Sequence, residues 1–258
     1  MKLIGVMHVK DAIRTIDECL TKLSSLVDEI IIVDNGSTDG TLEAYKKFPK
    51  IAKLLYTEGY HGGRDVRLLL EEAKKRNPDW IILIDSDEIF EDHLTRKIIE
   101  KYMRSAYSRI SFRMYNFWLS KKRFRIDRDW LLYTLLPQRQ MWRNLPGTYF
   151  NDIKVHYGPI QGISGPIYES PYRIKHYGYV ERDAVERKMR MYREIDKDKG
   201  YETLDPDMGR ILYFPFIEFR SGPLNFIFII LQHWFAKFVT SLVLIKRKYF
   251  HGYKFFKK

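Results

Sequence analysis

Cysteine is nearly absent from this sequence: Cys19 is the only cysteine among 258 residues. One cysteine excludes an internal disulfide, and a chain that folds without disulfides fits a reducing compartment. Because Cys19 lies on the apolar stripe of an expected helix, we expect it to be buried rather than catalytic. The sequence therefore predicts a cytoplasmic protein whose stability comes from an apolar core.

A signal peptide and a clean membrane-spanning segment are also lacking. The N-terminal apolar run is too short for a signal peptide, and charged residues follow it at once. Residues 224–245 are strongly apolar, but a spanning helix needs about 20 predominantly apolar residues. Four polar residues interrupt this run, namely Asn225, Gln232, His233 and Lys237. The run is therefore borderline as a transmembrane helix.

Acidic residues are in deficit, with 33 Asp and Glu against 45 Lys and Arg, so the formal net charge is +12. Such a balance implies an anionic partner, which can be a nucleotide, a membrane surface or a nucleic acid. The basic residues are dispersed and no nucleic-acid recognition module is evident, so we expect no nucleic acid as partner.

The first 115 residues alternate between expected strands and helices. Short apolar runs at residues 2–9, 29–33, 52–56 and 80–84 are typical of buried strands, and amphipathic helices are expected between them. This alternation predicts an α/β fold with a mostly parallel sheet and helices on both faces.

The apolar run at residues 80–84 ends abruptly in Asp85, Asp87 and Glu88. In an extended chain Asp85 and Asp87 point the same way, and two converging carboxylates repel each other unless a cation lies between them. A divalent ion held by carboxylates and by substrate phosphates fits this position. A strand that runs into a solvated acidic turn is the open alternative.

A second polar cluster, residues 34–41, follows the strand expected at residues 29–33. In open α/β sheets ligands bind beyond the carboxyl ends of the strands, and Asp34 and Asp85 both fall there on different strands. One acid can accept a hydrogen bond from a base or a ribose, while the acids after the other strand hold a metal on a pyrophosphate.

These two stretches together resemble a known family. Residues 33–41 resemble the V-D-[DN]-G-S-x-D-G-T signature of family 2 glycosyltransferases of the GT-A fold, and residues 84–88 resemble that family's D-x-D motif. The resemblance covers residues 1–115 well and extends more loosely to about residue 200. It implies transfer of a sugar from a nucleotide-sugar donor, usually with inversion, with Mn²⁺ or Mg²⁺ bridging the diphosphate.

The resemblance also implies roles for single residues of the donor site. Asp34 would contact the base, and Asp39 the ribose or nearby backbone. Asp85 and Asp87 would contact the ribose and the metal, Asp87 as a catalytic residue. Two arginines, Arg64 and Arg67, compete for the position of the family's arginine ahead of the acidic strand. The alternative for either arginine is a solvated helix face.

The acceptor half offers two further candidates. Asp152 is a candidate general base, although related sequences often carry His-Glu where this chain has His156 and Tyr157. His176 lies in a segment that resembles the one supplying a metal-binding histidine in many GT-A enzymes, and neutral imidazole suits Mn²⁺ beside carboxylates. A structural histidine is the alternative for His176.

The last part of the chain changes character. Apolar and aromatic residues from 206 onward are followed by a basic end that begins at Lys246, Arg247 and Lys248. This pattern indicates amphipathic helices in an anionic membrane interface, and a core or dimer-forming helix is the alternative. We therefore expect three parts: residues 1–115 binding the nucleotide sugar, residues 116–205 binding the acceptor, and a membrane-associating helical tail at 206–258.

The resulting hypothesis is a metal-dependent glycosyltransferase, peripheral on the inner face of a membrane, acting on a glycan or lipid-linked acceptor. Two alternatives are a nucleotidyl- or phosphoryl-transferase with the same acidic metal site, and a non-catalytic basic protein that binds membrane or nucleic acid. The sequence leaves open the sugar, the base and whether the protein forms an oligomer.

Overall fold

The computed structural model describes residues 1–125, 137–155, 157–195 and 216–218, together with residues 227, 230–231, 233–235, 237–239 and 241–242. At residues 125, 138–139 and 216–218 it describes the backbone alone. His156 and the basic end at 246–248, both considered in the sequence analysis, lie outside the described residues.

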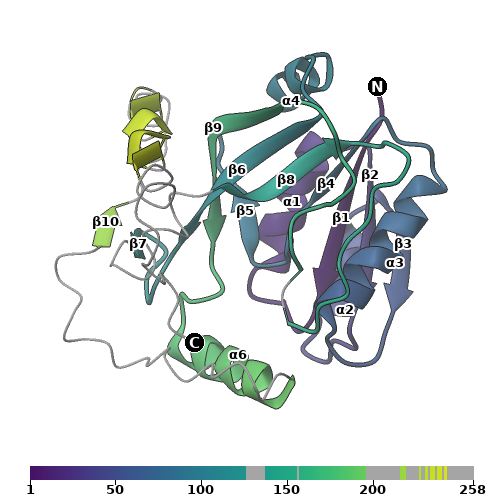
Figure 1. Ribbon diagram of the computed structural model, residues 1–258. Coiled ribbons are helices and arrows are strands. Elements are labelled where there is room, and N and C mark those ends of the chain that lie inside the picture. Colours follow the sequence, from purple (N-terminus) through teal and green to yellow (C-terminus); the bar gives the residue numbers. More distant parts are fainter. Residues whose placement is uncertain are drawn as a thin grey trace, which may run out of the picture.

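Eight strands form one sheet in the order β3-β2-β1-β4-β8-β6-β9-β5 (Figure 1). Their bounds are β1 Leu3–Val9, β2 Glu29–Asp34, β3 Ile51–Tyr56, β4 Trp80–Leu83, β5 Glu88–Phe90, β6 Arg109–Asn116, β8 Pro137–Arg143 and β9 Ile167–His176. A separate pair consists of β7 Arg123–Arg125 and β10 Phe216–Glu218.

The sheet has a parallel half and a mixed half. Strands β3, β2, β1 and β4 pair in parallel, as their continuous apolar runs predict. Strand β8 pairs antiparallel with both β4 and β6, whereas β6 and β9 are parallel and β9 pairs antiparallel with β5. The predicted α/β class is confirmed, and the mostly parallel order holds for the first half of the chain.

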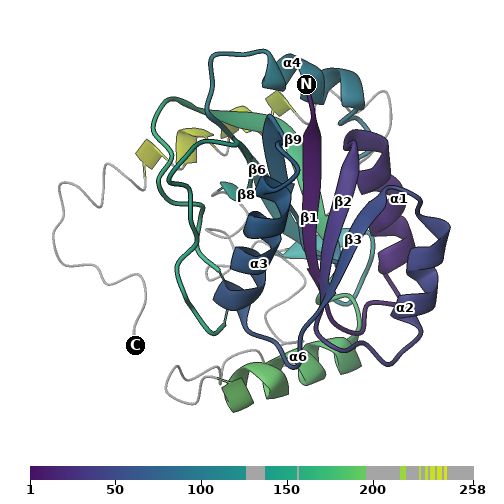
Figure 2. The same cartoon turned by 90° about the vertical axis from the view of Figure 1, so that its right-hand side faces the viewer.

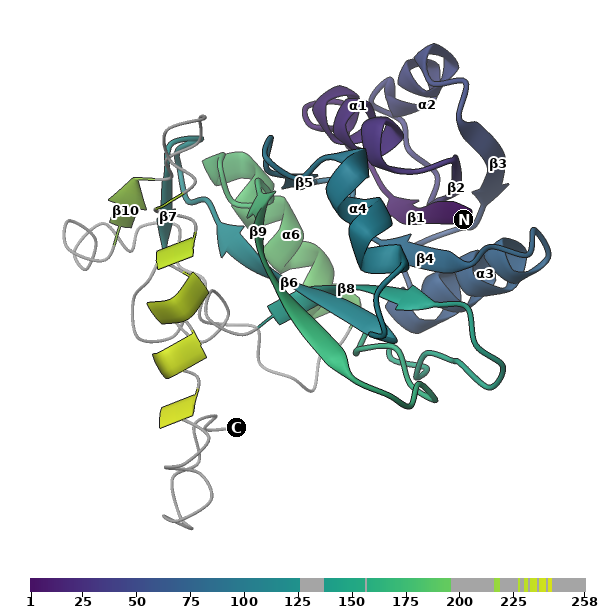
Figure 3. The ribbon, with the colours of Figure 1, turned by 90° about the horizontal axis from the view of Figure 1, so that it is seen from above.

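Helices cover both faces of the parallel half because successive strand residues point to opposite sides. The helices are α1 Ile16–Leu26, α2 Thr41–Ala44 with the 3₁₀ turn η1 Tyr45–Lys47, α3 Gly62–Lys74, α4 Arg96–Met103 and α6 Arg182–Ile195. Trp80 and Ile82 share a core cluster with α1 and α4, whereas Ile81 and Leu83 pack with α3. Figure 3 shows α1 and α3 on opposite sides of the strands.

Helix α6 does not belong to either layer. It lies beyond the carboxyl ends of the parallel strands, below the sheet in both Figure 1 and Figure 2. Its buried residues Val185, Met189 and Tyr192 form a small cluster of their own with Trp118 and Val155. This placement brings α6 to the edge of the sheet where ligands of α/β proteins bind.

The described residues between 227 and 242 are helical, and His233 among them contacts Arg113 of the sheet. Burial, together with the charge of Arg113, lowers the pKa of His233 to about 4. The neutral His233 Nδ1 therefore accepts a hydrogen bond from Arg113 Nη1 of β6, at 2.9 Å. Within the described part of the chain, no helix has both the length and the apolar character that crossing a membrane requires.

Candidate active site

The acidic residues after β4 lie in a tight turn rather than in extended chain. Strand β4 ends at Leu83, and the Glu88 carboxylate accepts a hydrogen bond from the backbone N–H of Asp85 at 3.0 Å. The thiol of Cys19 in α1 donates to the Glu88 carbonyl at 3.0 Å. Cys19 is buried, as predicted. The extended chain expected from Asp85 to Asp87 is therefore wrong, because residues 86–87 form a turn, and the two carboxylates have different partners.

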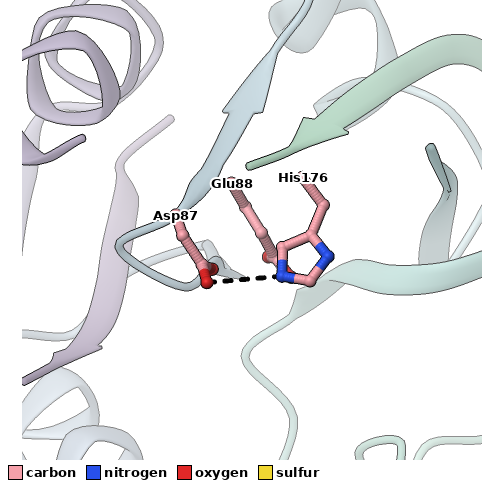
Figure 4. A group of neighbouring side chains, drawn as sticks. All are labelled: Asp87, Glu88 and His176. Carbon is pink, nitrogen blue, oxygen red and sulfur yellow. Dashed lines mark ion pairs between the residues drawn. The ribbon is translucent and has the colours of Figure 1, made fainter. Parts of the chain in front are cut away.

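Asp87, Glu88 and His176 form the candidate metal group (Figure 4). Each offers one ligand atom, and these atoms all lie within 4.8 Å of one another. Asp87 Oδ2 is 3.3 Å from His176 Nε2. The pairing of β5 with β9 brings the group together, because Glu88 and His176 are directly opposite in its register.

Asn116 orients the His176 ring. His176 Nδ1 lies 2.6 Å from Asn116 Oδ1, which can only accept, so we assign the proton to Nδ1. The other ring nitrogen, Nε2, then faces Asp87. Metal-binding histidines typically donate their other N–H to an oxygen in this way, which fits the predicted role of His176.

The polar atoms of Asp87, His176 and Lys188 converge on Gly178, where any side chain would clash with them. A methyl group at position 178 would lie 2.7 Å from His176 Nε2 and from Lys188 Nζ, and closer still to Asp87 Oδ2. Mg²⁺ ligands lie about 2.0–2.1 Å from the ion, which places neighbouring ligands about 3 Å apart. The two carboxylates and the imidazole, whose donor atoms lie within 4.8 Å of one another, therefore fit a small divalent ion.

Lys188 of α6 is a member of the site that the sequence analysis missed. Its Nζ lies 3.1 Å from Asp87 Oδ2 and 5.0 Å from the centre of the Tyr179 ring. Burial alone raises the pKa of Asp87, but Lys188 and His176 outweigh it and hold that pKa well below its usual value. Nothing in the sequence distinguished Lys188 from the other basic residues of its charged helix.

Asp85 contacts two aromatic side chains, Tyr157 and His8. Tyr157 donates its hydroxyl to Asp85 Oδ1 at 2.6 Å, and His8 Nδ1 lies 3.0 Å from the same oxygen. The His8 ring contacts the rings of Tyr60 and Tyr157, with centroids 5.3 and 5.8 Å apart. Tyr157 stands where related sequences often carry glutamate, and that departure was the available signal for its role.

Asp34 and Asp39 shape the loop beyond β2. Asp34 is buried, and its carboxylate accepts from the N–H groups of Gly36 and Ser37 at 2.9 and 2.7 Å and from the Tyr45 hydroxyl at 2.7 Å. Asp39 accepts from the Ile13 N–H at 2.9 Å. Both residues lie at the predicted edge of the sheet, and their contact with a nucleotide stays a prediction.

The arginines of α3 also have partners within the protein. The Arg64 guanidinium binds Asp65 at 2.7 Å and the carbonyls of Glu58 and Gly59 at 3.2 and 2.6 Å, which closes the loop before α3. This loop lies near the acidic turn, because His8 contacts both the ring of Tyr60 in the loop and Asp85. A direct contact of Arg64 with a nucleotide stays a prediction.

The candidate base Asp152 is exposed and paired with α3. Asp152 Oδ2 lies 3.2 Å from Arg67, and Oδ1 lies 3.8 Å from His61 Nδ1. The segment around Asp152 also crosses the start of α3, where the carbonyls of Ile153 and Lys154 accept from the first N–H groups. The structure thus connects Arg67 with Asp152, and the roles predicted for both stay predictions.

Comparison with known proteins points to one family. The family described as "Glycosyl transferase family 2" matches residues 6–158. The "Uncharacterized glycosyltransferase MG060 homolog" of Mycoplasma pneumoniae is 28% identical over 89 residues, which are 33% of this chain and 29% of that protein.

Two solved structures are also similar. One is TarS 1–349 of S. aureus in complex with UDP-GlcNAc, with 15% identity, a TM-score of 0.45, and coverage of 76% of this chain and 68% of that chain. The other is glucosyl-3-phosphoglycerate synthase of Mycobacterium tuberculosis with Mn²⁺, UDP and its product. It has 16% identity and a TM-score of 0.37, and covers 55% of this chain and 56% of that chain.

Proposed function

The chain belongs to glycosyl transferase family 2, and from this premise we propose that it transfers a sugar from a nucleotide-sugar donor to an acceptor hydroxyl. The observation that carries the proposal is the group of Asp87, Glu88 and His176 at the edge of the sheet, whose donor atoms lie within 4.8 Å of one another. In this proposal the family's metal-dependent reaction takes place at that group.

The proposed reaction is a direct displacement with inversion. The acceptor oxygen forms a bond to the anomeric carbon as the bond from that carbon to the diphosphate oxygen breaks, and Asp152 is proposed to take the acceptor's proton. Asp87, Glu88 and His176 are proposed to hold Mn²⁺ or Mg²⁺, and a bound ion would neutralise charge on the departing diphosphate.

A melting experiment tests donor binding. Among UDP, GDP, ADP, CDP and dTDP, we expect at least one to raise the melting temperature in the presence of Mn²⁺ and not in the presence of chelator. A ligand at a hundred times its Kd stabilises the folded state by about 2.7 kcal/mol, which corresponds to roughly 5–10 °C for a domain of this size. If none of the five raises the melting temperature, donor binding at this site is refuted.

The identity of the products separates the two enzyme classes considered for this site. Glycosyl transfer or donor hydrolysis releases a nucleoside diphosphate from the nucleotide sugar, whereas nucleotidyl transfer releases pyrophosphate. The family match favours the nucleoside diphosphate.

We also propose that the C-terminal segment binds an anionic membrane surface. Six of its described side chains are large, apolar and exposed: Ile227, Leu231, Trp234, Phe235, Phe238 and Leu242. After Glu218 the sequence contains eight Lys and Arg residues and no acidic residue. Apolar burial contributes about 25 cal/mol per Å², and each basic residue near anionic lipid adds about 1 kcal/mol. A membrane-borne or lipid-linked acceptor would suit this location.

Flotation with liposomes tests the membrane proposal. We expect the protein to float with anionic vesicles at low salt, and a variant with Trp234→Ser, Phe235→Ser and Phe238→Ser to remain at the bottom. These side chains are exposed, so the substitutions leave the core intact. Tyr149→Ser, at an exposed aromatic residue elsewhere, is the matched control and should float. If the unmodified protein fails to float, the segment is a core or oligomer element instead.

A further inference from the structure

The ammonium group of Lys188 lies where its charge would repel a metal ion bound at Asp87. Its Nζ lies 3.1 Å from Asp87 Oδ2, and the same oxygen lies 3.3 Å from His176 Nε2 within the candidate metal group. An ion placed there would share the Asp87 oxygen with the ammonium group at close range. Two cations on one carboxylate oxygen in a partly buried site repel each other.

The position of Lys188 is fixed by the packing of α6. Val185 and Met189, which flank Lys188 on the helix, are buried against Trp118 and Val155. At the start of α6, Asp183 pairs with Arg14 at 3.2 Å, which ties the helix to the segment after β1. Lys188 is therefore held at Asp87 by its helix, unlike a surface lysine that reorients freely.

We propose that Lys188 opposes binding of the metal ion alone and favours binding of the ion together with the donor's diphosphate. An incoming diphosphate offers oxygens to both cations, so its negative charge removes the repulsion between them and gives the ammonium a new partner. Each of the two ligands, metal and diphosphate, then raises the affinity of the site for the other, and Lys188 strengthens this coupling. This inference rests on the proposed function, since it takes the ligand of the Asp87 group to be a metal–diphosphate complex.

The test uses the full chain and two ligands. Removing the Lys188 charge is expected to raise the affinity for one ligand and lower the affinity for the other. Free Mn²⁺ is titrated and followed by its electron paramagnetic resonance signal, and the preformed complex of Mn²⁺ with inorganic pyrophosphate is titrated by calorimetry. Lys188→Met keeps the aliphatic stem over Tyr179 and removes the charge. We expect it to bind free Mn²⁺ about tenfold more tightly than the unmodified protein, and the pyrophosphate complex about tenfold more weakly.

Two controls separate charge from packing. Arg190→Met removes a charge from an exposed position of the same helix and should leave both affinities unchanged. Lys188→Arg keeps the charge and should bind free Mn²⁺ as the unmodified protein does. A variant that unfolds loses affinity for Mn²⁺, so unfolding cannot imitate the expected gain.

Equal or weaker binding of free Mn²⁺ by Lys188→Met overturns the role of Lys188 while leaving the proposed function intact. The same gain in Lys188→Arg also overturns it, because the effect then comes from loosened packing. If no variant binds Mn²⁺ in either form, the metal-dependent function falls and this inference falls with it.

Discussion

Replacing Asp87 by asparagine should lower the rate of sugar transfer by about 10²- to 10³-fold, the loss seen when one preorganised electrostatic contact is removed. Asp87 supplies the oxygen that contacts both His176 and Lys188 in the candidate metal group. Asparagine keeps the shape of the side chain but offers a neutral oxygen, which binds a divalent ion weakly. His176→Ala should reduce the metal dependence less, because imidazole contributes no charge to the ion.

The measurement is kcat/KM at increasing Mn²⁺, with circular dichroism as the check on folding. Asp92→Asn, at an exposed acid four residues beyond Glu88, is the matched control and should keep the full rate. Asp87→Asn also leaves Lys188 without its partner, so the double variant with Lys188→Met shows whether that charge contributes to the loss. Near-normal transfer by Asp87→Asn with chelator present would refute the metal mechanism.

Replacing Glu91 by alanine should reduce the free energy of unfolding by about 3–5 kcal/mol, because it leaves Arg173 as an uncompensated buried charge. Both side chains are almost fully buried. Arg173 Nη2 donates to Glu91 Oε2 at 2.8 Å, and its Nε lies 3.2 Å from the same oxygen. The Arg173 guanidinium also lies over the Tyr115 ring at 5.6 Å. Urea unfolding followed by circular dichroism measures the loss.

This ion pair also sets the geometry of the site. Glu91 follows β5 and Arg173 belongs to β9, the two strands that bring Glu88 opposite His176. The double variant Glu91→Leu with Arg173→Leu should recover much of the lost stability, since an apolar pair can replace a buried ion pair. Glu43→Ala, in an exposed pair with Lys46, should cost at most about 1 kcal/mol. A loss below about 1 kcal/mol for Glu91→Ala would contradict the prediction.

The first half of the fold could be predicted because its signals are local. Continuous apolar runs mark β1, β2 and β4, and the amphipathic spacing of residues 64–76 marks α3, so the α/β class and the parallel order follow from the sequence. Strands β8 and β9 were not predicted, because they carry charged residues in their interior. Arg173 is tolerated within β9 only because Glu91, distant in the chain, neutralises it.

The candidate site also has residues that the sequence predicted and features that it did not. The D-x-D motif, which carries part of the resemblance to family 2 glycosyltransferases, and the segment around His176, which resembles one in many GT-A enzymes, contribute Asp87 and His176 to one cluster. The aspartates Asp34 and Asp39 were also found at the expected edge of the sheet, where they hold the loop together. The turn at Glu88 was not visible in the sequence, because it depends on a side chain that folds back onto the backbone N–H of Asp85.

The sequence by itself determined the family, the α/β class and the acidic edge at which a nucleotide sugar is expected, because strand periodicity and short motifs are properties of neighbouring residues. Only the tertiary structure decided which residues surround the acids. Tyr157 reaches Asp85 across 72 positions, Asn116 reaches His176 across 60, and Lys188 reaches Asp87 across 101. Such contacts arise when distant segments return to one edge of a sheet, and no local pattern encodes that return.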